Sequence, residues 1–412
     1  MNRYLVGGAV RDQLLGVPVR ERDWLVTGSS AAELIALGYR PVGREFTVFL
    51  HPDSGEEHAL PRGTPGDATD ERALVEADLR RRDLTINAIA RDGNGSLIDP
   101  LDGVSDLQAG RLRHTPAFTE DPIRVLRLAR LAARYRRLGF QVAPETCTLV
   151  RQMVEQGRLQ TLTPERVWQE MEKALAGASP RTFFETLRQC AALAPLLPEL
   201  DRLFGIPQPA RWHPEIDCGE HSLLTLERAA ELSPLPEVRF AALLHDIGKG
   251  TTPAQQWPRH IGHETRGARL MQGLCQRLKT PNRYRDLGLK AARYHTDCHR
   301  TRQLRPRTLL RLLQALDALR RPPRLQSFLL VCEADYRGRT GWEQRSYPQA
   351  AWLQQARQAA LSVDVAAIAV RASTPQQIAR HIQLARERAI LAVKSTWPDE
   401  PVLNNLPWKS PQ

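Results

Sequence analysis

The sequence predicts an α+β protein in which a small N-terminal sheet domain precedes a mostly helical body. Short apolar or alternating stretches separated by glycine-containing turns occur before residue 115, and such stretches are typical of strands. From Pro122 onward, apolar residues recur at three- and four-residue spacing, which is the period of amphipathic helices. This change of period separates the two predicted parts of the chain.

The composition is that of a globular protein. Of the 412 residues, 42% are hydrophobic and 25% are charged, which excludes a wholly disordered or collagen-like chain. No apolar run reaches the roughly 18 residues of a membrane span, and Met1–Val10 lacks the features of a signal peptide. The six cysteines form no Cys-x-x-Cys pair, so we expect reduced thiols, a cytoplasmic protein and no membrane partner.

Positive charge is concentrated toward the C-terminus. The net charge is +12, and all but six of the 58 cations are arginines. Residues 1–140 contain 20 cations and 20 acids, whereas residues 301–412 contain 17 cations and eight acids. Such a region fits a polyanionic partner such as RNA, and on charge alone a basic surface without a partner is an equal alternative.

The individual elements follow from local pattern. The sheet domain is expected to contain strands at Arg3–Val6, Asp23–Val26, Phe46–Leu50 and Glu57–Leu60, and helices at Ala9–Leu15 and Ala31–Leu37. Pro61–Asp70 is rich in proline and glycine, which predicts a loop. The body is expected to contain helices at Ile123–Leu138, Pro164–Leu175, Pro180–Leu193, Leu223–Leu232, Val238–Ile247, Gly267–Leu278, Tyr284–Tyr294, Pro306–Leu319, Pro348–Ala360 and Thr374–Val393.

Two motifs near the N-terminus suggest phosphate and metal binding. The first strand ends in Gly7-Gly8 at the start of a helix, where backbone amides can approach a phosphate closely. Arg11 on that helix adds a charged donor. In Glu21-Arg22-Asp23, side chains two residues apart in a strand lie on the same side, so Glu21 and Asp23 form a pair of carboxylates. Magnesium is commonly held by such a pair together with substrate phosphates.

Two further motifs are rich in arginine. In Arg80-Arg81-Arg82-Asp83, Asp83 is predicted to cap a helix, with the arginines at the start of that helix. The second motif begins at Asp121 and continues with an arginine every three residues, at Arg124, Arg127 and Arg130. An aspartate and an arginine together can read the hydrogen-bonding edge of a base. Taken singly, each of the four motifs also fits a tight turn, a capped helix or a solvated face.

In this order the four motifs resemble those of the class II nucleotidyltransferases of the DNA polymerase β-like superfamily, and most closely those of the bacterial CCA-adding enzymes. The resemblance continues through Leu162–Val167 and Trp212–Glu215. It implies that the enzyme adds C, C and A to the 3′ end of tRNA from CTP and ATP. By position, the implied roles are Mg²⁺ binding by Glu21 and Asp23, phosphate binding by Gly8 and Arg11, nucleotide contact by Arg82, and base recognition by Asp121 and Arg124 with Arg127 and Arg130 beside them.

The sequence departs from the family pattern in two places. The first carboxylate is usually an aspartate, whereas Glu21 is one methylene longer, and we expect metal binding with altered geometry. The family also has a longer, basic loop before the arginine motif, where this chain has the short, acidic segment 61–78. In the family this loop is implicated in the switch from CTP to ATP. The short segment therefore supports addition of the terminal A less strongly than addition of C.

A second group of residues suggests a metal-dependent hydrolase. Seven of the eleven histidines lie between residues 213 and 299. His221, the adjacent His245-Asp246 and a later acid on a neighbouring helix can surround one divalent ion, which activates water. Asp297 is our expected fourth ligand, with His295 next. The segment Leu243–Gly250 resembles the HD phosphohydrolases, which implies Ni²⁺ or another divalent ion there. The alternative is that His245 and Asp246 are only a buried hydrogen-bonded pair.

The sequence therefore predicts a CCA-adding enzyme with an additional phosphohydrolase activity, acting as a monomer or homodimer. The alternatives are a poly(A) polymerase, a non-catalytic RNA-binding protein with a decayed site, and an HD phosphodiesterase with a vestigial N-terminal domain. The expected domains are a nucleotidyltransferase head at 1–118, a helical nucleotide-template and RNA-binding region at 119–210, an HD domain at 211–320 and a basic tRNA-binding region at 321–412.

Overall fold

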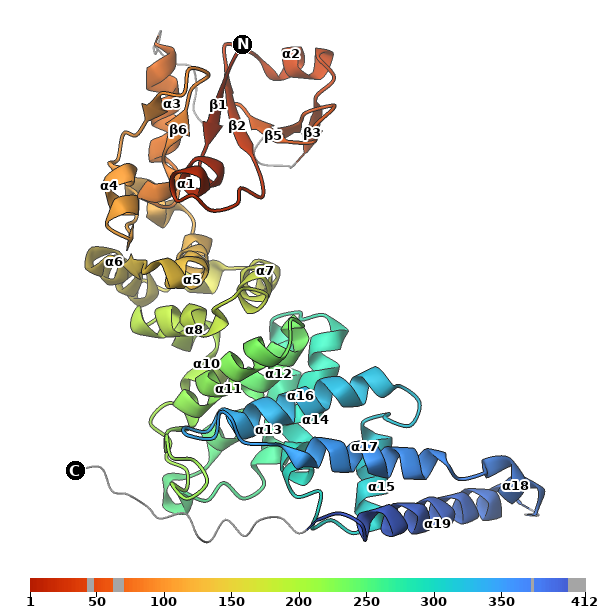
Figure 1. Cartoon of the computed structure of the whole chain (residues 1–412). Coiled ribbons are helices and arrows are strands. Elements are labelled where there is room, and N and C mark those ends of the chain that lie inside the picture. Colours follow the sequence, from red (N-terminus) through yellow and green to blue (C-terminus); the bar gives the residue numbers. More distant parts are fainter. Residues whose placement is uncertain (43–47, 62–69, 372–373, 399–412) are drawn as a thin grey trace. The chain divides into compact units, whose positions relative to one another are not determined.

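The structure is a computed structural model that describes residues 1–42, 48–61, 70–371 and 374–398 (Figure 1). Its internal contacts divide the chain into two compact units, Met1–Leu196 and Leu197–Gln412. The N-terminal unit contains the sheet and the C-terminal unit is helical. The predicted α+β fold is therefore confirmed. Among the described residues, every helix is too short or too polar to cross a membrane.

A seven-stranded sheet forms the first part of the N-terminal unit. Its strand order is β3-β4-β5-β2-β1-β6-β7. The strands are β1 (Asn2–Val6), β2 (Asp23–Thr27), β3 (Arg40–Val42), β4 (Val48–Leu50), β5 (Glu57–Ala59), β6 (Ala90–Arg91) and β7 (Leu97–Ile98). Successive residues of β2 face opposite sides: Leu25 packs with Val75 and Leu79, whereas Val26 packs with Leu34. The two faces of the sheet thus have separate apolar clusters.

Helices complete this unit. They are α1 (Gly8–Leu14), α2 (Ala31–Ala36), α3 (Glu71–Arg80), α4 (Gly103–Gln108), α5 (Ile123–Tyr135), α6 (Pro144–Glu155), α7 (Pro164–Leu175), α8 (Pro180–Gln189) and α9 (Leu193–Leu196). A two-stranded sheet joins β8 (Arg111–Leu112) to β9 (Gln141–Val142). The amphipathic helix α5 packs against α7 and α8. Its arginines are therefore available for contacts with the polar residues around the helix.

The arginine motif differs from its predicted placement. Arg80–Arg82 lie at the end of α3, not at the start of a helix, and Asp83 precedes a short 3₁₀ turn at Thr85–Asn87. The sequence forms α3 because Asp70 caps it and Val75 and Leu79 face the core. Arginines at a helix C-terminus complement its dipole. Part of the expected 61–78 loop is thus helical, while residues 62–69 lie outside the described residues.

The C-terminal unit is a bundle of helices around one apolar core. Its helices are α10 (Pro198–Asp201), α11 (Cys218–Leu232), α12 (Pro236–Leu244), α13 (His263–Arg277), α14 (Asn282–His299), α15 (Pro306–Ala315), α16 (Pro322–Arg337), α17 (Pro348–Leu361), α18 (Val365–Val370) and α19 (Pro375–Lys394). The core extends from Val238 in α12 to Leu353 in α17 and Ile390 in α19. The helices on both sides of residue 320 thus share a core.

Helix α16 was absent from the predicted elements. The helix begins with two prolines, and proline is well suited to the first turn of a helix. Its apolar residues lie on several sides, because Leu329, Val331 and Ala334, which point in different directions around the helix axis, are all buried. A helix buried on several sides lacks the amphipathic period by which helices are recognised.

Candidate active sites

Three segments meet at one end of the main sheet. Asp23 at the start of β2 is paired with Val6 of β1 on one side and with Glu57 of β5 on the other. Residues paired across strands carry their side chains on the same face. Asp23 and Glu57 therefore lie side by side, Glu21 precedes Asp23 by two residues, and Gly7-Gly8 follows Val6. We call Glu21, Asp23 and Glu57 the carboxylate site.

Two carboxyl groups of this site, those of Asp23 and Glu57, have raised pKa values. Burial is the main cause that raises the pKa of Asp23, and the charge of Glu21 raises it further, against the opposing charge of Arg82. Burial and then the charges of Asp23 and Glu21 raise the pKa of Glu57. A divalent cation would relieve this repulsion, and oxygen ligands are those that Mg²⁺ prefers. The residues present thus fit such an ion.

Gly7 and Arg82 border the carboxylate site. Gly7 has φ +67°, and a Cβ there would lie 2.5 Å from Arg82 Nη1. Glycine is thus required both for the backbone conformation and for the close approach of the guanidinium. Arg82 Nη2 lies 3.2 Å from Asp78 Oδ2. Within the described part of the chain, its buried Nε has no hydrogen-bond partner.

Arg11 belongs to a buried network. It is only 4% exposed, and it donates to Asp12 Oδ1 at 2.9 Å and to Asn87 Oδ1. Asp12 also accepts from Tyr135 Oη at 2.5 Å and from Arg134 at 2.8 Å. These contacts tie α1 to α5 and to the 3₁₀ turn. They give Arg11 a positioning role, and its contact with phosphate stays a prediction.

The arginines of α5 are paired within the protein. Arg127 Nε lies 2.7 Å from Asp83 Oδ2, and Arg130 Nε lies 2.5 Å from Glu170 Oε2. Arg124 donates from Nη2 to the Arg81 carbonyl at 2.7 Å. The stripe is thus not a simple solvated face, because each of these side chains ties α5 to a neighbouring segment.

Asp121 lies close to Arg124 and is held by a residue outside the motif. Arg166 Nη2 lies 2.6 Å from Asp121 Oδ2, and the Ile123 amide donates to Oδ1. Burial opposes ionisation of Asp121, but these donors and the charge of Arg124 outweigh it and lower the pKa. Arg166 was not predicted as a site residue, although it lies in the Leu162–Val167 motif.

The histidines of the C-terminal unit converge on a buried centre. His221 of α11, His245-Asp246 after α12, His263 of α13, His295 of α14 and Asp335 of α16 form overlapping groups whose ligand atoms lie within 4.8 Å of one another. We call these six residues the histidine cluster. Gly248 permits this packing, because a Cβ there would lie 2.0 Å from the His263 carbonyl oxygen. The structure thus brings together His221, His245 and Asp246, as expected from the sequence.

The orientation of the rings fits a metal ion. His245, His263 and His295 each donate Nδ1–H to a backbone carbonyl, at 2.7, 2.8 and 2.9 Å. Each Nε2 is then left with a lone pair. Among the described residues, buried His245 Nε2 and Asp246 Oδ1 have no hydrogen-bond partner. Unsatisfied buried acceptors on imidazole and carboxylate are the donor set that a divalent transition metal takes.

Asp335, and not Asp297, is the further acid of the cluster. Its Oδ1 lies 3.0 Å from His221 Nε2, and its Oδ2 lies 3.6 Å from His245 Nε2. Asp297 is two residues beyond His295 on α14 and so points to a different side of that helix. It belongs to none of the groups found among the described residues. Sequence spacing gave no signal for Asp335, because it lies far from His245 along the chain.

Further residues hold the cluster from outside. Glu215 Oε1 lies 2.9 Å from His221 Nδ1, so a carboxylate orients this ring. Lys249 Nζ lies 2.6 Å from Asp246 Oδ2. Burial opposes ionisation of Asp246, but the charge of Lys249 outweighs it and lowers the pKa of Asp246 well below its usual value. The sequence placed Glu215 in the Trp212–Glu215 motif without a role, and the structure shows that it contacts His221.

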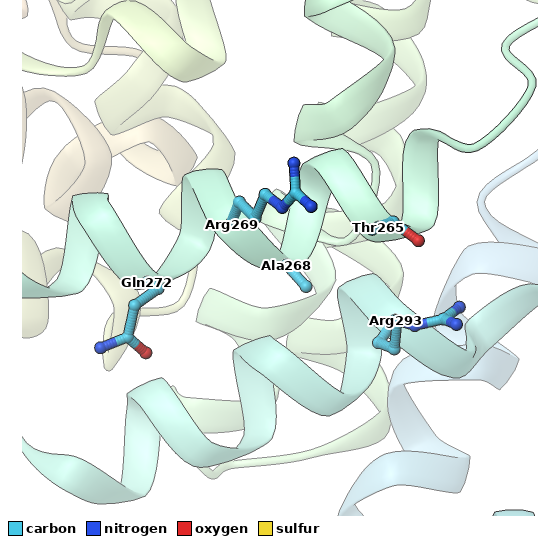
Figure 2. A pocket seen from close by; sticks show the side chains of 5 residues that line it. All are labelled: Thr265, Ala268, Arg269, Gln272 and Arg293. Atoms are coloured by element: carbon cyan, nitrogen blue, oxygen red, sulfur yellow. The ribbon is translucent and has the colours of Figure 1, made fainter.

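A hollow lies between α13 and α14, apart from the residues of the cluster (Figure 2). It is lined by Thr265, Ala268, Arg269, Gln272 and Arg293. Arg269 and Arg293 are exposed, and the hollow is open to solvent. The five residues that line it include no carboxylate and no histidine.

The fold and the two sites define a nucleotidyltransferase with an additional HD-type domain. Three protein families match parts of the chain: the poly A polymerase head domain at residues 56–113, the probable RNA and SrmB-binding site of polymerase A at 139–204, and the HD domain at 218–337. Glu57 lies inside the first match, while Glu21 and Asp23 precede it. The third match ends beyond Asp335.

Full-length relatives identify the family. The chain is 54% identical over 407 residues to a multifunctional CCA protein of Thioalkalivibrio sulfidiphilus, covering 96% of this chain and all of that protein. It is 53% identical over 408 residues to one of Alkalilimnicola ehrlichii, covering 97% and 99%. The chain belongs to the multifunctional CCA protein family.

Solved structures share the fold. A Thermotoga maritima CCA-adding enzyme complexed with tRNA matches with a TM-score of 0.63 at 18% identity, over 98% of this chain and 89% of that one. A CCA-adding enzyme complexed with CTP matches with a TM-score of 0.60 at 21% identity, over 94% and 87%. At this identity the likeness supports the fold of the whole chain.

Proposed function

We propose that the chain rebuilds the 3′-terminal CCA of tRNA from CTP and ATP, using the carboxylate site. The row of Val6, Asp23 and Glu57 across the sheet, next to Gly7-Gly8, is the observation that carries this proposal. Carboxylates, a glycine turn and Arg82 thus lie together at one end of the central strands. That set suits a nucleoside triphosphate and a divalent ion.

The reaction joins the terminal hydroxyl of the tRNA to the α-phosphorus of the nucleotide. A P–O bond forms, the bond to the β-phosphate oxygen breaks, and pyrophosphate leaves. Mg²⁺ bound at Glu21, Asp23 and Glu57 would supply charge stabilisation for the attacking and leaving oxygens. Arg82 would meet the phosphates beside the backbone of Gly7 and Gly8, and Arg11 would keep α1 in place.

Base choice is assigned to the start of α5. Asp121 and Arg124 would present an acceptor and a donor to the base. Arg166 fixes the carboxylate of Asp121, while Arg127 and Arg130 brace α5 through Asp83 and Glu170. Discrimination would therefore depend on Asp121 and Arg124, with the next two arginines as supports.

The test is an extension assay. The protein is incubated with tRNA lacking CCA and labelled CTP and ATP, and the product ends are sequenced. Asp23→Ala should abolish extension, whereas a rate near that of the parent would contradict the magnesium assignment. Poly(A) products would favour a poly(A) polymerase instead.

The second proposed activity is phosphohydrolysis at the histidine cluster, with a 2′,3′-cyclic phosphate as test substrate. The unpartnered His245 Nε2 and Asp246 Oδ1 support it. Water would add to phosphorus while a ribose oxygen leaves, and Ni²⁺ or another divalent ion would lower the pKa of that water when bound. His245→Ala should remove hydrolysis and leave CCA addition intact.

We also propose a division into regions and a setting. The head is assigned to 1–118, the template region to 119–210 and the HD domain to a segment that extends from 211 through α16. The basic region that follows would hold the tRNA backbone. The six cysteines are free and buried, which fits a cytoplasmic enzyme. Sedimentation would distinguish a monomer from a homodimer.

A further inference from the structure

Arg339 is a largely buried cation beside the histidine cluster that the chemistry described above does not use. Its side chain is 11% exposed, and Nη2 lies 3.8 Å from Asp335 Oδ1. That separation exceeds hydrogen-bond length. Within the described part of the chain, its buried Nε has no hydrogen-bond partner. A buried guanidinium with an unused donor is costly, so its place needs a reason.

The backbone around Arg339 is fixed on both sides. Gly338 approaches α11 so closely that a Cβ would lie 2.9 Å from the Thr225 backbone. The Thr340 amide donates to Glu215 Oε2 at 3.3 Å, and Glu215 is the carboxylate that orients His221. The segment that carries Arg339 is therefore attached to the same helix and loop that hold the cluster.

Aromatic rings hold the guanidinium in one place. Arg339 Cζ lies 5.4 Å from the centre of the Tyr336 ring and 5.0 Å from that of Trp342. Such contacts stabilise a cation while leaving its in-plane N–H groups free. The head group is thus positioned in advance without consuming its donors.

Electrostatics indicates what those donors are for. Once a divalent ion occupies the cluster, Asp335 is shared with that ion, and a second cation close by is repelled. An anion that lies between the ion and the guanidinium removes the repulsion. The planar fork of arginine matches the oxygens of a phosphate group.

We propose that Arg339 binds the phosphate oxygens of the ligand taken by the metal-loaded histidine cluster. The ligand class is a tetrahedral phosphate, either a phosphoester or inorganic phosphate. This inference rests on the proposed phosphohydrolase function for its substrate, but binding of phosphate itself does not require turnover. Arg339 is a binding residue, and it lies outside the group of metal ligands.

The experiment uses the full chain loaded with nickel. Inorganic phosphate affinity is measured by calorimetry, and kcat and KM are measured with a 2′,3′-cyclic nucleotide. Arg339→Gln should weaken phosphate binding and raise KM roughly ten- to hundredfold, as for loss of a charged hydrogen bond, with nickel content unchanged. Arg339→Lys should fall between the parent and Arg339→Gln.

The matched control is Arg345→Gln. Arg345 stacks on the same Trp342 ring at 4.2 Å but forms no ion pair with Asp335 among the described residues. Arg345→Gln should leave the phosphate affinity and KM within about twofold of the parent values. CCA addition by each variant checks that the N-terminal unit is folded, and circular dichroism checks the helical C-terminal unit.

Three results would overturn the proposal. They are an unchanged phosphate affinity in Arg339→Gln, a loss of nickel in that variant, and an equal effect of Arg345→Gln. A parent protein that binds phosphate but hydrolyses no ester contradicts the proposed phosphohydrolase function instead. The phosphate titration of Arg339→Gln then still decides the role of Arg339.

Discussion

His221 Nε2 lies 3.0 Å from Asp335 Oδ1, so that α11 and α16 are joined inside the bundle. Both side chains are buried. Asp335 also lies 2.5 Å from His299 Nε2. A carboxylate shared by two imidazoles and close to a third ring is well placed to complete a metal centre whose other members lie on separate helices.

Replacing Asp335 should therefore remove the metal. Asp335→Asn keeps the volume but loses the charge that balances the surrounding imidazoles, and we expect nickel binding and cyclic phosphate hydrolysis to be lost. Metal analysis and calorimetry measure this. CCA addition should persist, because the carboxylate site lies in the other unit.

Asp297→Asn is the matched control for that variant. It changes the acid that sequence spacing favoured, and it should retain nickel because Asp297 lies outside the cluster. The assignment of Asp335 is contradicted if Asp297→Asn loses the metal while Asp335→Asn keeps it.

This contrast shows where sequence reasoning succeeds. Adjacent residues such as His245-Asp246 can be identified from a local motif, and α7 has the predicted bounds Pro164–Leu175. Asp335 could not be identified from a local motif, because only packing of α16 against α11 and α12 brings it to the cluster. Periodicity did not reveal α16 because apolar residues cover several of its sides.

The same limit applies to the carboxylate site. Asp23 follows from its motif, but Glu57 is identified only by the parallel pairing of β2 with β5. The arginines at 80–82 were assigned to the wrong end of a helix, because the apolar residues after Asp83 were taken as the start of a helix, whereas they form a short 3₁₀ turn. Local composition predicted the elements, while long-range pairing determined the sites.

Glu57 should contribute to nucleotide addition. Glu57→Gln removes one of three neighbouring carboxylates and should lower the rate of CCA addition by about tenfold or more, which is at least about 1.4 kcal/mol in activation free energy. The dependence on magnesium concentration should shift upward. Initial rates over a magnesium series measure both effects.

Glu56→Gln is the control for Glu57→Gln, because it removes a neighbouring carboxylate that lies outside the carboxylate site. Glu56 accepts from Trp24 Nε1 at 2.8 Å and pairs with Arg22, so it should leave the magnesium dependence unchanged. Equal losses in the two variants would argue against a special role for Glu57.

Tyr347 should tune the metal affinity of the histidine cluster. Its hydroxyl lies 2.9 Å from His299 Nδ1, and His299 in turn holds Asp335. Tyr347→Phe should weaken nickel binding about three- to tenfold, as for loss of one hydrogen bond. Calorimetry with nickel alone measures this without turnover.

Tyr336→Phe is the control for Tyr347→Phe. The Tyr336 ring also contacts His299, but among the described residues its hydroxyl makes no hydrogen bond to that histidine. Its nickel affinity should equal that of the parent. An unchanged affinity in Tyr347→Phe would show that the hydroxyl does not act through His299.

Asp83 should make the stability of the N-terminal unit depend on pH. Burial opposes ionisation of Asp83, but Arg127 and Asn87 outweigh it, so the folded-state pKa lies well below the usual 3.8. An acid with a lowered pKa stabilises the fold fully above its unfolded value, and this contribution is lost as pH falls toward the folded value. Asp83→Asn should therefore lower the free energy of unfolding by about 1–3 kcal/mol at neutral pH. The difference from the parent should shrink below about pH 4.

Urea unfolding from about pH 3 to about pH 7, followed by circular dichroism, measures this difference in the free energy of unfolding. Asp53→Asn is the exposed control. A difference that stays constant across that range would contradict the ionised Asp83–Arg127 pair.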